Sequence, residues 1–253
     1  ENKSALLADE MGLGKTVQAI LALKILFHRG AIRNALIVAP KSVIGSVRES
    51  LIDQVPEGWG GHLALWSPEL IVKIIEPANW DDGVPPPGFS GNTSRDRRLD
   101  WKTPAHVYLT TYGLVRNDIK KGTFDLDEFD CVVLDEAHQV KNPKSQQSLA
   151  LHRLNAKYRW GLTGSPLMNR AGDVYAIFQF LDPERFPAVR ATELSEMRPG
   201  PIFDAIGESY LRRNKSEDLP PKTRHEIWVD LDGSQKEIYK RTLDEGRSRV
   251  KEL

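Results

Sequence analysis

The stretch LLADEMGLGKT, residues 6–16, lies between an apolar run and a segment whose apolar residues recur with helical spacing. Its last part, GLGKT, matches the GKT half of the Walker A pattern, in the strand, loop and helix context that this pattern requires. Glycines in such a loop let successive backbone N–H groups turn inward around an anion, and the helix N-terminus adds partial positive charge. The stretch therefore predicts a phosphate-binding loop, although Asp9 and Glu10 stand where such loops more often begin with glycine.

The polar residues of this loop favour a nucleotide as the bound anion. Lys15 can contact the β- and γ-phosphates of ATP, and the Thr16 hydroxyl can hold Mg²⁺. The alternative is a glycine turn that caps an amphipathic helix, but GxGKT should arise by chance in only about one of a hundred chains of this length. We therefore predict ATP and Mg²⁺ as cofactors, with nucleotide contacts from Gly12, Leu13, Gly14, Lys15 and Thr16.

Five apolar runs predict an α/β fold built on a parallel sheet. Each run is too continuous in apolar residues for a half-exposed strand, and most are followed by a segment with helical spacing. That alternation is typical of a parallel sheet with helices on both faces. The predicted strands are 4–8, 34–39, 106–111, 131–135 and 158–163.

Capping residues and apolar spacing predict the helices between these strands. The first helix begins at Thr16 and ends before Gly30, a residue suited to a C-terminal cap. The others are 43–54 capped by Ser42, 145–154 capped by Asn142 or Ser145, 173–181 capped by Asp173, and 234–253 capped by Ser234.

Polar residues follow each of the five strands, in the segments DEMGLGKT, PKS, TTY, DEAH and TGS. Because the carboxyl ends of parallel strands meet at one edge of the sheet, we expect these segments to share a ligand-binding crevice. In DEAH, residues 135–138, Asp135 is suited to hold Mg²⁺ and Glu136 to position and activate an attacking water. The alternative is an acidic pair that starts a turn.

The other three strand endings are less specific. LTGSP, residues 162–166, offers the hydroxyls of Thr163 and Ser165, but a simple turn explains it equally well. PKS at 40–42 and TTY at 110–112 offer hydroxyls, one lysine and backbone amides that suit phosphate oxygens. A plain helix cap explains Ser42 as well.

Composition limits the class of protein. The 35 lysines and arginines balance the 35 aspartates and glutamates, so nucleic-acid binding would depend on local patches rather than a global basic field. The single cysteine, Cys131, excludes an internal disulfide and is expected to be buried and inert. No apolar stretch approaches the roughly 20 residues of a membrane span, so we expect a soluble protein with no membrane partner.

The stretch 77–104 interrupts the alternation of strands and helices with proline, glycine and polar residues. We expect a solvated surface loop there. Its arginines, Arg95, Arg97 and Arg98, leave a nucleic-acid contact as the alternative. The chain begins without methionine, directly at a strand, which indicates a piece of a longer protein.

The motifs of this chain resemble, in their order, those of the Swi/Snf-type ATPases, the chromatin-remodelling branch of helicase superfamily two. The resemblance covers nearly the whole chain apart from 57–104. It rests on DEMGLGKTVQAI (9–20), ALIVAPKSVIGSVRES (35–50), YLTTYGLVRND (108–118), VVLDEAHQVKNPKSQ (132–146), RWGLTGSPLMNR (159–170), FLDPERF (180–186) and YLRRNKSEDLPPK (210–222).

This resemblance implies the first of two RecA-like lobes, a P-loop NTPase fold, of a DNA-dependent ATPase that translocates on double-stranded DNA. Residues 1–210 would form the lobe, and 211–253 a brace, with Arg212 and Arg213 structural, and a helix leading to a second lobe. Lys15 and Glu136 would be catalytic, Thr16 and Asp135 would hold the metal, and the isolated lobe would be weakly active. DNA contacts would come from Pro40, Lys41, Ser42, Thr110, Thr111, Thr163, Gly164 and Asn169.

Some residues depart from the family pattern, with Val47 where tryptophan is usual and Arg170 where asparagine is usual. The short spacer after FLDPERF favours a compact prokaryotic-type translocase, so we expect an intracellular protein of the prokaryotic cytoplasm, or of the nucleus if eukaryotic. Its protein cargo is not identified. The alternatives are a strand-separating helicase, the motor of a restriction or defence complex, or a nucleotide-switched binding module. Asp9 and Glu10 are hypothesised to engage cations of the second lobe.

Overall fold

A computed structural model of the chain describes residues 3–45, 57–75, 93–123, 129–164, 171–189, 193, 196–214 and 232–251. The chain separates into two compact units, Glu1–Lys215 and Ser216–Leu253. The second contains helix α9, Gly233–Lys251. None of the described helices is long and apolar enough to cross a membrane.

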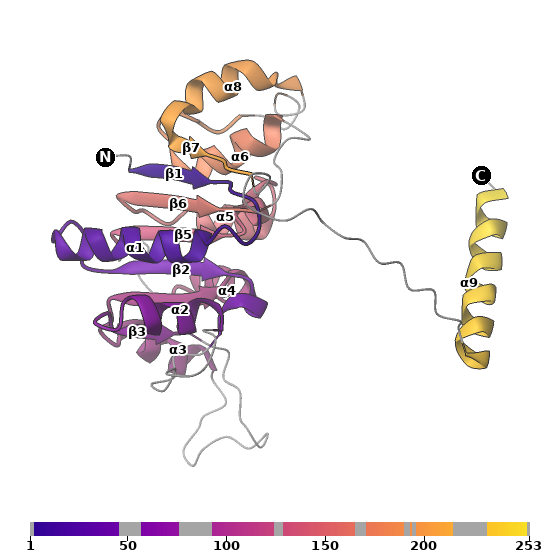
Figure 1. The fold of residues 1–253 in the computed structure, drawn as a ribbon, viewed down its shortest axis with the longest axis horizontal. Coiled ribbons are helices and arrows are strands. Elements are labelled where there is room, and N and C mark those ends of the chain that lie inside the picture. The colour runs from indigo at the N-terminus through magenta and orange to yellow at the C-terminus, as the bar shows by residue number, and fades with distance from the viewer. Residues whose placement is uncertain are drawn as a thin grey trace, which may run out of the picture. The chain divides into compact units, whose positions relative to one another are not determined.

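The first unit is built on a seven-stranded sheet in the order β3-β4-β2-β5-β6-β1-β7, with every neighbouring pair parallel (Figure 1). Five of its strands confirm the predicted ones: β1 Ser4–Leu7, β2 Ala35–Ala39, β4 Val107–Thr111, β5 Cys131–Asp135 and β6 Tyr158–Leu162. The sequence did not predict the edge strands β3, Val72–Ile74, and β7, Tyr210–Leu211. Because β7 contains Leu211, the first unit continues past the expected boundary at residue 210.

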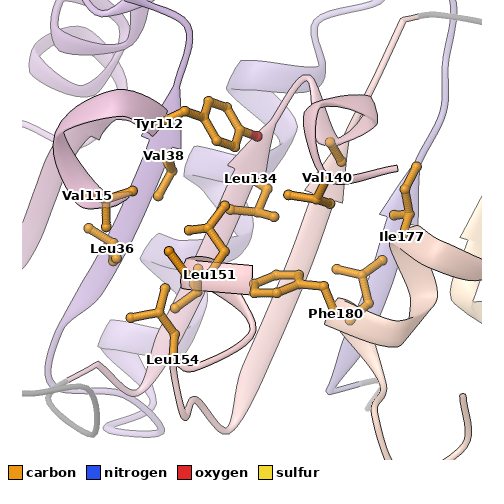
Figure 2. Close-up of a cluster of buried hydrophobic side chains, with 14 of the residues drawn as sticks. Leu36, Val38, Tyr112, Val115, Leu134, Val140, Leu151, Leu154, Ile177 and Phe180 are labelled. Carbon is orange, nitrogen blue, oxygen red and sulfur yellow. The ribbon is translucent and has the colours of Figure 1, made fainter. Parts of the chain in front are cut away.

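Both faces of the sheet are buried, as the continuous apolar runs predict. In β2, Leu36 and Val38 belong to one core cluster, and Ala35, Ile37 and Ala39 to the other. The first cluster includes residues of α4, α5 and α6, and Figure 2 shows Tyr112, Leu151 and Phe180 of these helices around Leu134. The second cluster includes buried residues of α1 and α2.

Helices therefore cover the two faces separately. On one face lie α1, Lys15–His28, and α2, Gly58–Trp66. The other face is covered by α3 (Thr93–Lys102), α4 (Tyr112–Lys121), α5 (Gln146–Leu151), α6 (Ala171–Leu181) and α8 (Pro199–Ile206). This unit also contains three short 3₁₀ helices, η1 (Lys41–Val43), η2 (Ala137–Val140) and η4 (Gly207–Ser209).

The predicted helix ends are correct in part. Gly30 follows α1 with φ 64°, and the Ser145 side chain accepts a hydrogen bond from Ser148 N at the start of α5, so both assignments are confirmed. Asp173 lies inside α6 instead of capping it. At α9 the cap is Asp232, whose Oδ1 accepts from Gln235 N, so the assignment of Ser234 is wrong.

The helix predicted over 43–54 lies mostly outside the described residues. Ser42 lies inside η1, so it does not cap a helix, and residues 46–54 lie outside the described residues. The backbones of Gly45 and Gly58 lie against each other: a Cβ on Gly45 would be 1.9 Å from Glu57 O, and one on Gly58 would be 2.6 Å from Val43 O. Both residues have positive φ, so only glycine fits at either position. The contact between Gly45 and Gly58 is called the glycine neck below.

The surface loop predicted over 77–104 is wrong for its last part. Residues 93–102 form α3, whose Trp101 is buried; 77–92 lie outside the described residues. Arg97 is buried and pairs with Asp118, 3.0 Å away, which also accepts a hydrogen bond from Trp101 Nε1. A buried charge needs such a partner, so Arg97 holds α3 to α4 and is not exposed to nucleic acid.

Candidate functional site

The polar strand endings meet at one edge of the sheet, as predicted. The register pairs Ala39 with Thr111 and Asp135 with Leu162, so the strands end level with one another. Beyond these ends lie the phosphate-binding loop, the PKS segment, Glu136 and Gly164. Asn169 lies outside the described residues.

Two glycines shape the loop between β1 and α1. Gly12 has φ 86° and Gly14 φ 71°, and Gly14 is the N-cap of α1. Side chains rarely adopt this left-handed backbone, which is why the loop needs glycine at both positions. The loop thus leads directly into a helix N-terminus, where backbone N–H groups are available to an anion.

The Lys15 side chain folds back onto the first residues of its own loop. Its Nζ donates hydrogen bonds to Asp9 O at 2.8 Å and to Glu10 O at 3.1 Å. Gly164, from the segment after β6, packs on the same residues: a Cβ there would lie 2.6 Å from Met11 Cγ and 3.3 Å from Lys15 Nζ. The TGS segment therefore contacts the loop, and Lys15 lies between them.

Asp135, at the end of β5, is a buried carboxylate. Its Oδ2 accepts a 2.7 Å hydrogen bond from Trp59 Nε1, and its Oδ1 accepts from Glu136 N at 3.0 Å. The Tyr112 hydroxyl donates to its backbone oxygen at 2.6 Å. Burial raises the pKa of Asp135; the Trp59 hydrogen bond and the Lys15 charge oppose that rise without cancelling it.

Trp59 is a site residue that the sequence did not reveal. The usual tryptophan position of the family holds Val47, which lies outside the described residues. Trp59 reaches Asp135 from α2, which starts at the glycine neck, where Gly60 N also donates to Ile44 O at 2.8 Å. A tryptophan flanked by glycines was the available clue, but the contact depends on tertiary packing.

Glu136 has an unusual backbone. It is the one non-glycine residue with positive φ among the described residues, with φ 52° and ψ 54°. Such a conformation costs about 1–3 kcal/mol and persists where the surrounding structure enforces it. It turns the chain sharply after β5, and the Glu136 Oε2 lies 3.1 Å from His138 Nδ1. Strain of this kind is concentrated at functional sites.

The predicted DNA contacts divide into two groups. Thr110 and Thr163 are fully buried, and the Thr110 hydroxyl donates to Ile75 O at 3.4 Å, so neither side chain faces solvent in this structure. The Thr111 hydroxyl accepts from Leu114 N and caps α4. Lys41 and Ser42 are exposed, and Pro40 and Gly164 are half-buried.

Asp9 engages a cation of this same chain, so the hypothesis of a second-lobe partner is wrong for it. The carboxylate is fully buried; Arg213 donates to Oδ1 from its backbone N at 2.8 Å and to Oδ2 from Nε at 3.0 Å and from Nη2. Burial would raise the pKa of Asp9, but the Arg213 hydrogen bonds and charge outweigh it and hold the pKa below its ordinary value.

Comparison with known proteins shows the family of this chain. The chain matches the SNF2-related domain family over residues 1–252. It is 30% identical over 247 residues to CHD3-type chromatin-remodeling factor CHR7 of Arabidopsis thaliana, and 31% identical over 261 residues to Chromodomain-helicase-DNA-binding protein 3 homolog of Caenorhabditis elegans. These matches cover 95% and 94% of the chain, but the chain spans only 19% and 14% of those relatives.

A solved structure shows the same fold. The Sulfolobus solfataricus SWI2/SNF2 ATPase core in complex with dsDNA superposes with a TM-score of 0.62 at 24% sequence identity. The superposition covers 99% of this chain and 49% of that one. The predicted resemblance is confirmed: the chain belongs to the SNF2-related domain family, and its parallel sheet has the RecA-like fold of the SWI2/SNF2 ATPase core.

Proposed function

We propose that this chain is the nucleotide-binding lobe of a DNA-dependent ATPase that moves along double-stranded DNA. The observation that carries the proposal is the meeting of Lys15, Asp135 and Glu136 at one edge of the sheet, beside a glycine loop that opens a helix. Family membership supports ATP hydrolysis. The chain spans a minor part of its relatives, so the activity is that of a larger protein.

The loop binds the ATP phosphates through the backbone around Gly12, Leu13 and Gly14. Lys15 now donates to two backbone carbonyls. Phosphate oxygens are stronger acceptors because they are charged, so Lys15 exchanges these carbonyls for the β- and γ-phosphates when ATP binds.

The residues present fit a magnesium ion. Burial raises the pKa of Asp135, which disfavours its charged form, and a bound divalent cation would stabilise that charged form. Lys15 lies near enough for its charge to lower the pKa of the same carboxylate. Asp135 and the Thr16 hydroxyl would hold the ion, which supplies charge neutralisation at the phosphates. Glu136 orients and activates the attacking water.

A second lobe would supply a further group for hydrolysis. Phosphoryl transfer uses an arginine finger that typically contributes about 10³–10⁵ in rate, and the fold superposes on half of the archaeal core. We therefore expect residues 1–253 alone to bind nucleotide weakly and to hydrolyse it poorly.

Double-stranded DNA is the nucleic acid on which the protein is proposed to translocate. Exposed Lys41 and Ser42 lie at the same edge as the nucleotide loop and suit phosphate oxygens. The name of the nematode relative includes DNA binding, and the archaeal core is described with double-stranded DNA. Because the proposed substrate is DNA, the protein would work in the prokaryotic cytoplasm or the eukaryotic nucleus.

The test is ATP turnover by the full-length protein with duplex DNA, single-stranded DNA or RNA. We expect duplex DNA to stimulate turnover most, and Lys15→Ala to abolish it. Strand separation, measured on the same duplex DNA in a parallel unwinding assay, would favour a helicase or a restriction motor. Nucleotide binding without turnover under any of the three conditions would favour a switched binding module and would overturn the proposal.

A further inference from the structure

We propose that Arg213 is a positioning residue for Lys15, and that it sets nucleotide affinity from outside the phosphate-binding loop. Through Asp9, Arg213 fixes the two backbone carbonyls on which Lys15 rests. This inference rests on the proposed nucleotide site and assigns it a residue that lies about 200 positions away in the sequence.

The backbone at the end of β7 and just after it pairs with the first residues of the loop. Strand β7 pairs in parallel with β1, and the pairing continues past the end of β1, where Ala8 N donates to Leu211 O at 2.7 Å. Beyond the ends of both strands, Glu10 N donates to Arg213 O at 3.1 Å. The first residues of the loop therefore lie in an extended ladder instead of a free turn. Arg213 is the last residue of this ladder that the structure shows.

The Arg213 side chain then joins the start of the loop to helix α1. It binds the buried Asp9 carboxylate through Nε and Nη2, and the same Nη2 donates to Gln18 Oε1 at 2.5 Å. Gln18 lies in the first turns of α1 and donates from Nε2 to Leu13 O at 2.8 Å. One guanidinium thus holds the start of the loop directly and its middle through Gln18.

Lys15 lies on the other side of the same backbone. The carbonyls of Asp9 and Glu10 accept from Lys15 Nζ, while the Asp9 carboxylate and the Glu10 N–H are held by Arg213. Release of Arg213 would leave a buried carboxylate unpaired and free these carbonyls to move. Lys15 would then start from a less defined position, so ordering it on a phosphate would cost more conformational entropy.

The experiment measures the dissociation constant of a fluorescent ATP analogue for the full-length protein carrying Arg213→Gln. We expect it to rise about tenfold, which corresponds to roughly 1.4 kcal/mol. Arg33→Gln is a matched control, because Arg33 binds Asp130 through the same backbone N, Nε and Nη2 groups. This pair lies at the amino ends of β2 and β5, opposite the nucleotide site. Arg33→Gln should leave the dissociation constant unchanged.

Further variants separate positioning from loss of structure. Gln18→Ala keeps the Asp9 pair and should raise the dissociation constant about two- to threefold, with little added effect in the Arg213→Gln background because the link is already broken. Arg213→Lys should lie between wild type and Arg213→Gln, and it serves as the test if Arg213→Gln does not fold. The KM for ATP should rise in each, with kcat at saturating ATP and DNA little changed.

Two results have distinct meanings. Wild-type binding together with unchanged affinity in Arg213→Gln would overturn the positioning role and leave the proposed function intact. If Arg213→Gln does not fold, unchanged affinity in both Arg213→Lys and Gln18→Ala has the same meaning. Failure of the wild-type protein to bind the analogue would overturn the proposed function itself.

Discussion

The indole Nε1 of Trp59 donates a 2.7 Å hydrogen bond to Oδ2 of Asp135, and both side chains are buried. The carboxylate therefore has a fixed orientation before any cation arrives. Trp59→Phe keeps an aromatic ring but removes the donor, so the metal ligand loses part of its orientation. We expect the Mg²⁺ concentration needed for half-maximal ATP binding to rise several-fold, measured by titration at fixed nucleotide.

Trp101→Phe provides the control for this change. Trp101 is equally buried and donates to another buried carboxylate, that of Asp118. It packs on Tyr108 and Phe129, near the amino ends of β4 and β5 and not at the carboxyl ends that carry the site. Each substitution should lower the free energy of unfolding by about 1–3 kcal/mol, because a buried acceptor loses a partner. If both variants need the same Mg²⁺ concentration as wild type, Trp59 is only a structural residue.

Gly164→Ala should affect nucleotide binding more than stability. A Cβ would meet Met11 Cγ at 2.6 Å, but Met11 is 70% exposed and can move, whereas Lys15 Nζ at 3.3 Å is held on the loop. We expect the free energy of unfolding to change by less than about 0.5 kcal/mol. The ATP dissociation constant should rise about three- to tenfold because the Cβ narrows the space around Lys15.

Gly161→Ala should show the opposite pattern. Its Cβ would lie 2.9 Å from Leu6 Cδ1 and 3.1 Å from Ala137 Cβ, inside the core. Overpacking there should cost about 1–3 kcal/mol of stability, measured by urea denaturation, with ATP affinity of the folded protein unchanged. Equal effects of the two alanines on affinity would contradict the assigned role of Gly164.

The Asp9 pair should make stability depend on pH. Because the folded pKa of Asp9 lies below its ordinary value of 3.8, its contribution is complete above that pH and is lost as pH falls through the folded pKa. Asp9→Asn should therefore be less stable than wild type near neutral pH, and the difference should shrink below about pH 4. Urea denaturation across this range measures it, and a difference independent of pH would contradict the ion pair.

Glu136 combines a chemical role with a strained backbone, and two substitutions separate them. Glu136→Gln should bind ATP normally and lose about 10²–10⁴ in DNA-stimulated turnover. Glu136→Gly should lose turnover as well, but glycine adopts φ 52° without the left-handed penalty of about 1–2 kcal/mol. The glycine variant should be at least as stable as the glutamine variant in thermal unfolding. Turnover that survives in Glu136→Gln would contradict the catalytic role.

The central strands and the phosphate-binding loop could be predicted because their properties are local. A buried parallel strand must be apolar on both faces, as in ALIVA and CVVLD, and only glycine allows the turn before Lys15. Edge strand β7 has two residues, too few for any pattern. Helix α3 was missed because its sequence, TSRDRRLDWK, is largely polar, and buried pairs such as Arg97 with Asp118 hold it in place.

The contacts that complete the site depend on residues far apart in the chain. Asp9 meets Arg213 across 204 positions, and Trp59 meets Asp135 across 76. The sequence shows each residue but not its partner, so it suggests second-lobe cations as partners of Asp9 and Glu10 and gives no sign of Arg213. The buried positions of Thr110 and Thr163 are likewise a property of the packed sheet.

The contact between Gly45 and Gly58 has a consequence for Asp135, although neither glycine touches it. Glu57 O lies where a side chain on Gly45 would have to lie, and Val43 O where one on Gly58 would. A side chain at either position would push the two backbone segments apart beside Trp59. Because Trp59 Nε1 donates to Asp135 Oδ2, two glycines outside the site help to set the orientation of its buried carboxylate.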